Sequence, residues 1–597
     1  MLAIDLEWPS ETPHGQVPDL VSVAWANDTG SAVLTAAQDR KSIVDVVSAA
    51  LSVGYVGQNC PGDLVALIRF EPQLLGSVLE AYNAGRIHDT MTREKRIDIA
   101  EGAYRRRGGY DLGSIASRRA SIVVDKSDPW RTRYGELIGR PLSEWPPDAV
   151  RYALLDAQST WRVYREQQPF ERYMIGNDIH ARAHFVLHLM SLRGIRVDTA
   201  AVHALARDIE VETKRLRQAL IDDGLARVGG SKKNPRVVRT PDAARKAIVE
   251  LGSNRRTDTG LISISKQALS GVVVPPGHPL YAYQELTTLT GTASKNLPPL
   301  RYPSITTSYD ECVVTGRMSS RQEDGQPNAT NLQNLPRTID DPKTPTQGLM
   351  NRFRGCLTPS TGYTFGIVDY SSAELVTFAD VEMAWFGESR MGDAIKAGRN
   401  LHEDFAETLV QAPYDARNPD HKQARQIAKV FNFGKLGGMG DVKFQTHLAQ
   451  KTGIQLPVYR VEQITAAWKH KWGTDRYFRH IDRHQAGGRF TVVAPRTGFQ
   501  RGGMTYTEAC NFPFQSTAAV GLKVALWDLF RATLDGGPLT GSRIVLVVHD
   551  EIVMEHPTDR AESAFAIQKQ IMVDSFGLVC PDVPISVEGK LAMRYGK

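Results

Sequence analysis

The chain has 597 residues, 42% of them hydrophobic and 23% charged, which is enough apolar material for several buried cores and predicts several domains. A net charge of +6 and a pI near 8.9 favour a polyanionic partner only slightly, so no function class follows from charge alone. The five scattered cysteines fit no CxxC zinc pattern, so we expect reduced thiols in a cytoplasmic protein. No stretch approaches the roughly 18 apolar residues of a membrane helix, so we expect neither a signal peptide nor a membrane partner.

The first block, to about residue 175, alternates strand-like and helix-like runs and predicts an α/β layer. An apolar strand begins at Met1, and residues two apart on a strand project from the same face, so Asp5 and Glu7 can share metal ions. Tyr152 and Asp156 are four apart, which places a hydroxyl and a carboxylate on one face of a helix. The alternative is that Asp5 and Glu7 are ordinary polar residues on the outward face of a strand.

From His180 to Leu220 the pattern predicts long helices, and a basic segment follows between residues 227 and 256. Its cations stand among glycines and prolines, as suits a flexible tip that grips phosphates, although such a cluster could also be solvated surface. The cations are Arg227, Lys232, Lys233, Arg236, Arg239, Arg245, Lys246, Arg255 and Arg256.

Two apolar runs in the second half of the chain end in acids. Residues 365–368 lead to Asp369, and residues 544–549 lead to Asp550 and Glu551 before an apolar strand resumes. Burying such a hairpin while exposing its acids implies a cation, and Mg²⁺ prefers carboxylates supplemented by water and substrate phosphates. Phosphoryl transfer is the leading chemistry, and the alternative is that Asp369 and Asp550 are turn or capping acids.

Arg425, Lys429 and Phe433 recur every four residues and lie on one stripe of a predicted helix between those acids. A nucleoside triphosphate fits this stripe, because the cations can take the phosphates while the ring packs on sugar and base. Taken alone, the stripe could be an amphipathic helix with solvated cations. Its position between the two acid motifs favours the nucleotide.

Five short motifs follow one another along the second half of the chain: Thr315-Gly-Arg317-Met-Ser-Ser320, Asn331-Leu-Gln-Asn-Leu-Pro336, Asp369-Tyr-Ser-Ser-Ala-Glu374-Leu, the helix of Arg425, Lys429 and Phe433, and His549-Asp550-Glu551. In this order they resemble the polymerase core of family A DNA polymerases, the bacterial DNA polymerase I type, and the resemblance runs from the middle of the chain to its end. The resemblance implies an α+β right hand of thumb, palm and fingers that closes around duplex DNA.

The resemblance also implies roles for single residues. Asp369 and Asp550 would hold two Mg²⁺ ions, with Mn²⁺ as an alternative, and Glu551 would support them. Glu374 would exclude ribonucleotides by closing the space beside the 2′ carbon of the sugar. The remaining substrate contacts would be the nucleotide stripe, a phosphate contact by His402, a minor-groove contact by Arg317, and primer-template contacts by Asn511 and Gln515.

The first block resembles the DEDDy 3′→5′ exonuclease, which has an RNase H-like α/β fold. On this resemblance Asp5, Glu7, Asp63 and Asp156 would be the metal ligands, again for two ions, and Tyr152 would orient the attacking water. The nearby Asp89 belongs to another segment of that family and is expected to be structural.

Three positions depart from the polymerase family. Gly437 falls where bacterial relatives carry a tyrosine, Thr507 where they carry an arginine, and Ser372-Ala373 replaces Gln-Ile. Base selection is the property we expect them to alter. The pair Gly437-Gly438 is also expected to end the fingers helix, as glycine commonly does.

The sequence thus predicts a multidomain protein with an exonuclease domain at residues 1–175, a thumb at 176–300 with its tip near 225–258, and a palm at 301–597 with fingers inserted near 385–500. Its expected function is that of a monomeric, phage-like replicative DNA polymerase with proofreading, acting on primer-template DNA and dNTPs in the host cytoplasm, with replisome proteins as further partners. The alternatives are an RNase D-like nuclease with a degenerate polymerase half, a single-subunit RNA polymerase, and a non-catalytic DNA-binding scaffold.

Overall fold

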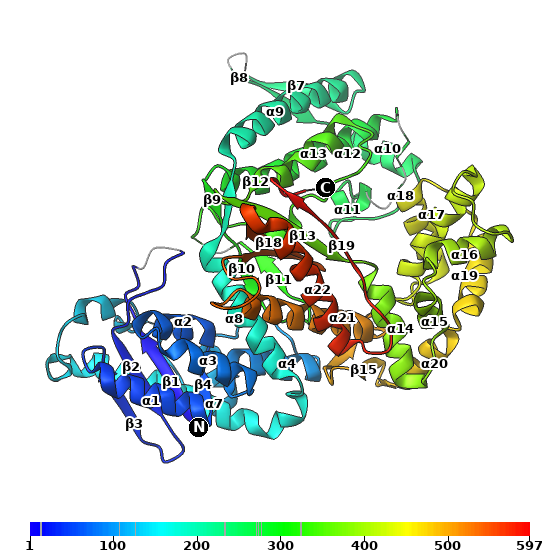
Figure 1. Ribbon diagram of the computed structural model, residues 1–597. Coiled ribbons are helices and arrows are strands. Elements are labelled where there is room, and N and C mark those ends of the chain that lie inside the picture. Colours follow the sequence, from blue (N-terminus) through cyan, green and yellow to red (C-terminus); the bar gives the residue numbers. More distant parts are fainter. Residues whose placement is uncertain are drawn as a thin grey trace.

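The computed structural model describes residues 1–11, 15–106, 108–125, 127–231, 234–269, 272, 274–275, 277–322 and 325–596. Figure 1 shows an N-terminal module in blue and a central body that carries the red C-terminal elements. Above the body lie a pair of helices and a hairpin, and to its right lies a helical lobe in yellow. Among the described residues, no helix is both long and apolar enough to cross a membrane.

The N-terminal module is built on a five-stranded mixed sheet of order β3-β2-β1-β4-β5. β1 (Leu2–Glu7) lies at its centre, antiparallel to β2 and parallel to β4. α7 (Pro147–Gln167) packs against β1, β2 and β3. The module's other elements are β2 (Ser22–Ala26), β3 (Ala32–Ala36), α1 (Arg40–Val53), β4 (Tyr55–Gly57), α2 (Cys60–Phe70), α3 (Leu74–Asn83), β5 (Ile87–Asp89), α5 (Leu112–Ala120) and α6 (Trp130–Arg133).

α4 (Thr90–Glu101) joins this module to the rest of the chain and is unusual in composition, because its charged side chains are buried. Lys95 donates to Glu311 Oε2 at 2.9 Å and to Asp310 Oδ1 at 3.1 Å, and Thr92 donates to Glu311 Oε1 at 2.9 Å. Past the end of α4, a Cβ on Gly102 would lie 2.9 Å from the backbone of Gly503. The module therefore contacts the body both through buried ion pairs and through close backbone packing.

α8 (Asn177–Arg193) follows and packs on α2, α3 and α4 on one side and on α21 on the other. The long helices expected from His180 onward are therefore present. α9 (Thr199–Asp222) and α12 (Pro279–Leu300) form the helix pair seen above the body in Figure 1. Short strands in this part of the chain are β6 (Ile195–Val197), β9 (Ser304–Ile305), β10 (Ser308–Asp310), β11 (Ser319–Arg321) and β12 (Leu357–Thr358).

The basic segment forms regular elements rather than a plain loop. β7 (Ala226–Ser231) and β8 (Asn234–Arg239) pair as an antiparallel hairpin, and α10 (Pro241–Glu250) and the short α11 (Lys266–Leu269) follow. Lys232, Lys233 and the side chain of Arg236 lie outside the described residues. Arg239 lies over the ring of Tyr283 at 4.7 Å, so this cation is held against α12.

The central body is a four-stranded antiparallel sheet of order β17-β18-β13-β19. Residues alternate between its faces, as expected for strands. Val368 and Tyr370 of β13 enter the core formed with α21 and α22, whereas Phe365 and Ile367 enter the core on the side of α9, α12 and α13. The elements are α13 (Pro345–Gly355), β13 (Tyr363–Tyr370), α21 (Tyr506–Ala532), β17 (Arg543–Val548), β18 (Glu551–Pro557), α22 (Ala561–Val579) and β19 (Val587–Ala592).

The helical lobe is inserted between β13 and α21. Its core is apolar but contains one buried amide: the side-chain oxygen of Asn432 accepts hydrogen bonds from the indoles of Trp468 at 2.9 Å and Trp472 at 3.1 Å. The lobe consists of α14 (Ala373–Phe386), α15 (Arg390–Lys396), α16 (Leu401–Val410), α17 (Pro419–Gly434), α18 (Asp441–Thr452), α19 (Val458–Trp472), α20 (Asp475–Asp482), β14 (Gln485–Ala486), β15 (Arg489–Val493) and β16 (Gln500–Met504).

Candidate functional site

The predicted acids of the second half of the chain meet at one end of the central sheet. Asp369, near the end of β13, is paired in register with Glu551, the first residue of β18. Asp550 lies in the two-residue loop between β17 and β18, and its carbonyl oxygen accepts the Tyr370 amide at 3.3 Å. Directly opposed residues project from the same face of a sheet, so Asp369 and Glu551 both face the side of α9 and α12.

Tight backbone turns present these acids. His549, which precedes Asp550, has a φ of +58°, and Ser372, which precedes α14 and Glu374, has a φ of +55°. This left-handed conformation is uncommon for residues other than glycine and is frequent at functional sites. Asn59 has a φ of +60° at the start of α2, the helix that carries Asp63. The same left-handed conformation therefore occurs beside the acids of the N-terminal module.

Cations surround the loop that carries Asp550. The pKa of His549 is lowered by burial and by the charges of Arg337, Arg317 and Arg354, whereas Asp550 opposes this effect. Arg317 also forms an ion pair with Glu374. The sheet end thus combines acids that can hold a cation with guanidinium groups that can meet phosphates.

Tyr595 completes this cluster, and sequence patterns gave no signal for it. Its hydroxyl donates to Glu551 Oε1 at 2.7 Å. Tyr595 lies beyond β19, three residues from the end of that strand, so only the folded chain brings it to the acids.

The predicted nucleotide stripe and His402 come together in the helical lobe. The rings of His402 and Phe433 are 5.4 Å apart, and Asn432 Nδ2 lies 3.1 Å from His402 Nδ1. Burial, followed by the charges of Lys429 and Arg425, lowers the pKa of His402 to about 4. His402 is therefore neutral at physiological pH, and it can hydrogen-bond to a phosphate without adding charge.

Arg425 of this stripe is already engaged, because it pairs with Glu403 at 3.1 Å. Both side chains are more than one third exposed, so the pair is weak and a phosphate can replace the carboxylate.

The helix that carries the stripe ends earlier than predicted. α17 ends at Gly434, and a turn over residues 435–438 follows it. A Cβ at Gly434 would lie 2.6 Å from the ring of Phe444 in α18, so the glycine allows close packing there. Gly438 does supply a left-handed turn, with a φ of +67°. At Gly437 a Cβ would overlap the amide of Asn511, so the glycine allows the end of α17 to approach α21.

Asn511 and Gln515 are four residues apart on α21 and lie on one face of that helix. Asn511 donates to the carbonyl oxygen of Thr507 at 2.7 Å. The neighbouring Ser516 is close to Gly316, which precedes Arg317. The predicted primer-template contacts therefore belong to the same region as the ion pair of Arg317.

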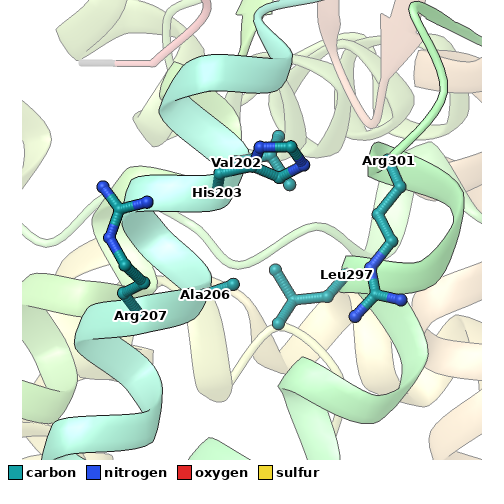
Figure 2. A pocket seen from close by; sticks show the side chains of 6 residues that line it. All are labelled: Val202, His203, Ala206, Arg207, Leu297 and Arg301. Atoms are coloured by element: carbon teal, nitrogen blue, oxygen red, sulfur yellow. The ribbon is translucent and has the colours of Figure 1, made fainter.

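A large hollow of about 1300 Å³ lies between α12 and the loops that carry the Asn331–Pro336 motif. Lys295, Arg301 and Arg337 are among its lining residues, together with many hydroxyl and amide side chains. Figure 2 shows a smaller hollow of about 420 Å³ between α9 and α12, in which Leu297 and Arg301 face His203, while the guanidinium of Arg207 points away. The larger one carries three cations on a mixed polar and apolar lining, and such cations can contact a nucleic-acid backbone.

A second acid cluster occupies the N-terminal module. Among the described residues, one group of three potential metal ligands has its ligand atoms within 4.8 Å of one another. The group consists of Asp5, Glu7 and Asp156. Burial, and then the charges of Asp156, Glu7 and Asp63, hold the pKa of Asp5 well above its usual range. The pKa of Asp156 is raised to about 6, chiefly by burial. These four acids, two of them buried and two half-buried, repel one another when charged, and a cation would relieve that repulsion.

The donor set fits divalent cations. Glu7 Oε1 and Asp156 Oδ1 are buried and have no hydrogen-bond partner within the described part of the chain. Tyr152 and Asp156 lie on one face of α7, as their spacing predicted, and Tyr152 partly offsets the rise in the pKa of Asp156. Asp63 is buried beside them, and its pKa is raised well above the usual range by burial and by Asp89. Carboxylates of this kind are the ligands that Mg²⁺ and Mn²⁺ prefer.

Two further residues adjoin this cluster, Tyr134, for which the sequence carried no signal, and Asp89, for which it did. Tyr134 is buried against Tyr152, with ring centroids 6.2 Å apart, and its hydroxyl donates to the carbonyl oxygen of Ala149 at 2.7 Å. Its presence partly offsets the rise in the pKa of Glu7 that burial causes. Asp89 accepts the backbone amides of Asn59 at 3.1 Å and Cys60 at 3.0 Å, which fixes the start of α2 and agrees with the structural role expected for it.

Comparison with known proteins identifies the second part of the chain. Residues 242–597 match the model of the family described as DNA polymerase family A. The chain belongs to this family. It is 25% identical over 575 residues to a thermostable DNA polymerase I of Thermus thermophilus, which covers 88% of this chain and 62% of that protein. It is 27% identical over 480 residues to DNA polymerase I of Deinococcus radiodurans, covering 77% of this chain and 46% of that protein.

This family A chain therefore spans less than two thirds of the length of these relatives. A solved structure shares its fold: the POL domain of Pol1 from M. smegmatis, in complex with DNA primer-template and dNTP, superposes with a TM-score of 0.69 at 18% identity and covers 99% of this chain and 95% of that one.

Proposed function

We propose that this family A chain is a DNA-templated DNA polymerase that adds dNTPs to a primer 3′-end. The observation that carries the proposal is the register of Asp369 with Glu551, which brings Asp369 and Asp550 to one end of the central sheet from positions far apart in the sequence. Asp369 and Asp550 would hold two Mg²⁺ ions, which lower the pKa of the primer hydroxyl and neutralise the triphosphate.

The helical lobe would bind the nucleotide. Arg425 and Lys429 meet the phosphates, the neutral His402 donates a hydrogen bond to them, and Phe433 packs on the sugar and base. Glu374, at the first turn of α14, would close the space beside the 2′ carbon of the sugar and so favour deoxynucleotides.

Primer-template DNA would lie along the large hollow beside α12. Lys295, Arg301 and Arg337 supply phosphate contacts there, and Arg317 with Asn511 and Gln515 would contact the primer end. The basic hairpin of β7 and β8 would grip the duplex farther from the active site.

We infer a second activity, 3′→5′ exonuclease, from the acid cluster of the N-terminal module. Asp5, Glu7, Asp63 and Asp156 would hold the metal ions, and Tyr152 would orient the attacking water. A frayed primer end reaches this site more easily, because a mispaired end lacks stacking of about 1.4 kcal/mol per step. A monomeric state, replisome partners and a phage replicative role in the host cytoplasm stay predictions from the sequence.

Primer extension with each dNTP and each rNTP tests the polymerase. We expect dNTP extension by the wild-type chain, its loss in Asp550→Asn, and retained excision of single-stranded DNA in that variant. Nucleotide release without extension would instead favour a nuclease with a degenerate polymerase half, and rNTP extension would favour an RNA polymerase. DNA binding without any turnover would favour a scaffold.

Excision of a mismatched primer tests the exonuclease. Asp5→Ala combined with Glu7→Ala should abolish excision and leave extension at its wild-type rate. Intact excision in this double variant contradicts the proposed exonuclease site.

A further inference from the structure

We propose that Tyr595 is a positioning residue of the polymerase site that acts by holding the carboxylate of Glu551. The inference rests on the proposed polymerase function and extends it to a residue that no motif marked. Glu551 pairs in register with Asp369 and directly follows Asp550. The hydrogen bond of 2.7 Å from the Tyr595 hydroxyl therefore reaches the residue that neighbours both acids.

Both partners of this hydrogen bond are shielded from water. Tyr595 is 2% exposed and Glu551 is 8% exposed. A hydrogen bond to a carboxylate is shorter and stronger than one between neutral groups, and the low dielectric of the interior strengthens it further. Removing the hydroxyl would therefore take away a strong restraint on the orientation of Glu551, beside the acids proposed to hold metal.

The segment that delivers Tyr595 is itself fixed. Arg594 pairs with Asp198 at 2.6 Å, and the amide of Tyr595 donates to the carbonyl oxygen of Leu357 at 2.9 Å. The guanidinium of Arg354 lies over the Tyr595 ring, 5.0 Å from its centroid. The hydroxyl thus has a defined position from which to orient Glu551.

The ring of Tyr595 does not need its hydroxyl for packing. It belongs to the apolar core that includes Phe365, Ile367 and Val553, on the face of the sheet from which Glu551 projects. A phenylalanine fills the same space, so Tyr595→Phe separates the hydrogen bond from the anchoring of the segment.

The test compares single-nucleotide primer extension by the full chain carrying Tyr595→Phe, Glu551→Ala or both. We expect Tyr595→Phe to lower kcat about tenfold while the KM for dNTP changes less than about twofold, as for groups that orient metal-binding side chains. In the Glu551→Ala background it should have no further effect, because the group through which it acts is gone. A wild-type kcat in Tyr595→Phe, or an equal loss in both backgrounds, overturns the inference.

Tyr110→Phe is the matched control. Tyr110 is also buried and donates to a carboxylate, Asp98 Oδ2 at 3.0 Å, but it lies in the N-terminal module. We expect its extension kcat to equal that of the wild type. A loss as large as in Tyr595→Phe would mean that any such bond matters for folding, and it would overturn a specific role for Tyr595.

A second readout does not require catalysis. Binding of Mn²⁺ without nucleotide, followed by electron paramagnetic resonance in a chain carrying Asp5→Ala and Glu7→Ala, should weaken about tenfold when Tyr595→Phe is added. Unchanged Mn²⁺ affinity overturns the inference. Failure of the unsubstituted chain to extend primers would instead contradict the proposed function, and the Mn²⁺ measurement would then decide on Tyr595 alone.

Discussion

Arg317 and Glu374 form an ion pair although 57 residues separate them in the sequence. The pair links the turn after Gly316 to the first turn of α14, so the side chain proposed to meet the primer end contacts the one proposed to exclude ribonucleotides. Their side chains are 40% and 31% exposed, and a pair this accessible contributes only about 0 to 1 kcal/mol to stability. Either partner is therefore free to exchange this contact for DNA or nucleotide.

Substituting Glu374 should change substrate choice without changing stability. In Glu374→Ala the space beside the 2′ carbon opens, and we expect the ratio of dNTP to rNTP incorporation to fall by at least about tenfold, the effect of about 1.4 kcal/mol. The measurement is kcat/KM for each nucleotide, with the midpoint of thermal unfolding as control. An unchanged ratio would remove Glu374 from sugar selection.

Metal removal should destabilise the N-terminal module. Without a cation, the acids around Asp5 and Asp156 repel one another in a buried site, as their raised pKa values indicate. We expect a chelator at pH 8 to lower the melting temperature of the wild-type chain, and Asp156→Asn to abolish most of this dependence by removing one charge. Calorimetry with and without Mg²⁺ decides, and equal chelator sensitivity in both chains would contradict the metal site.

Replacing Lys95 alone should lower the free energy of unfolding strongly. It is 5% exposed and lies opposite Glu311, which is 0% exposed, so Lys95→Met leaves a carboxylate buried without its cation. Loss of one partner from a buried pair costs about 3–5 kcal/mol, whereas replacing both by apolar side chains is often neutral. Urea unfolding of Lys95→Met, Glu311→Leu and the double variant checks this, and additive losses in the double variant would disprove a direct pair.

Glu382 gives the fold a pH dependence. Burial, opposed by hydrogen bonds and by Arg476, raises its pKa from 4.5 to about 7. A carboxyl group with a raised pKa contributes stability that is present below pH 4.5 and is lost as the pH rises through about 7. The difference corresponds to at most about 3 kcal/mol, so Glu382→Gln should be more stable than wild type at pH 8.5 and about equal at pH 4.5. Denaturant midpoints at the two pH values test the sign.

The sequence could predict the acids because strand periodicity and apolar runs determine where they lie. Asp5 with Glu7, Tyr152 with Asp156, and the Arg425 stripe all follow from a period of two or four residues. The glycine pair predicted a stop near the end of α17, but the last helical residue is Gly434, and a spacing rule does not give such an exact end. Tyr595 and Tyr134 reach their carboxylates from distant segments, and no local pattern marks such partners. The family resemblance supplied Arg317, Glu374, His402, Asn511 and Gln515, which no spacing rule would have selected.

The buried charges of α4 limit how parts of this chain can be recombined. A chimera that joined residues 1–175 to the second half of another family member would place Lys95 opposite residues that did not evolve as its ion-pair partners. Residues that must be exchanged together are therefore not continuous in sequence. Asp310 and Glu311 would have to be transferred with the N-terminal module, because both accept hydrogen bonds from Lys95.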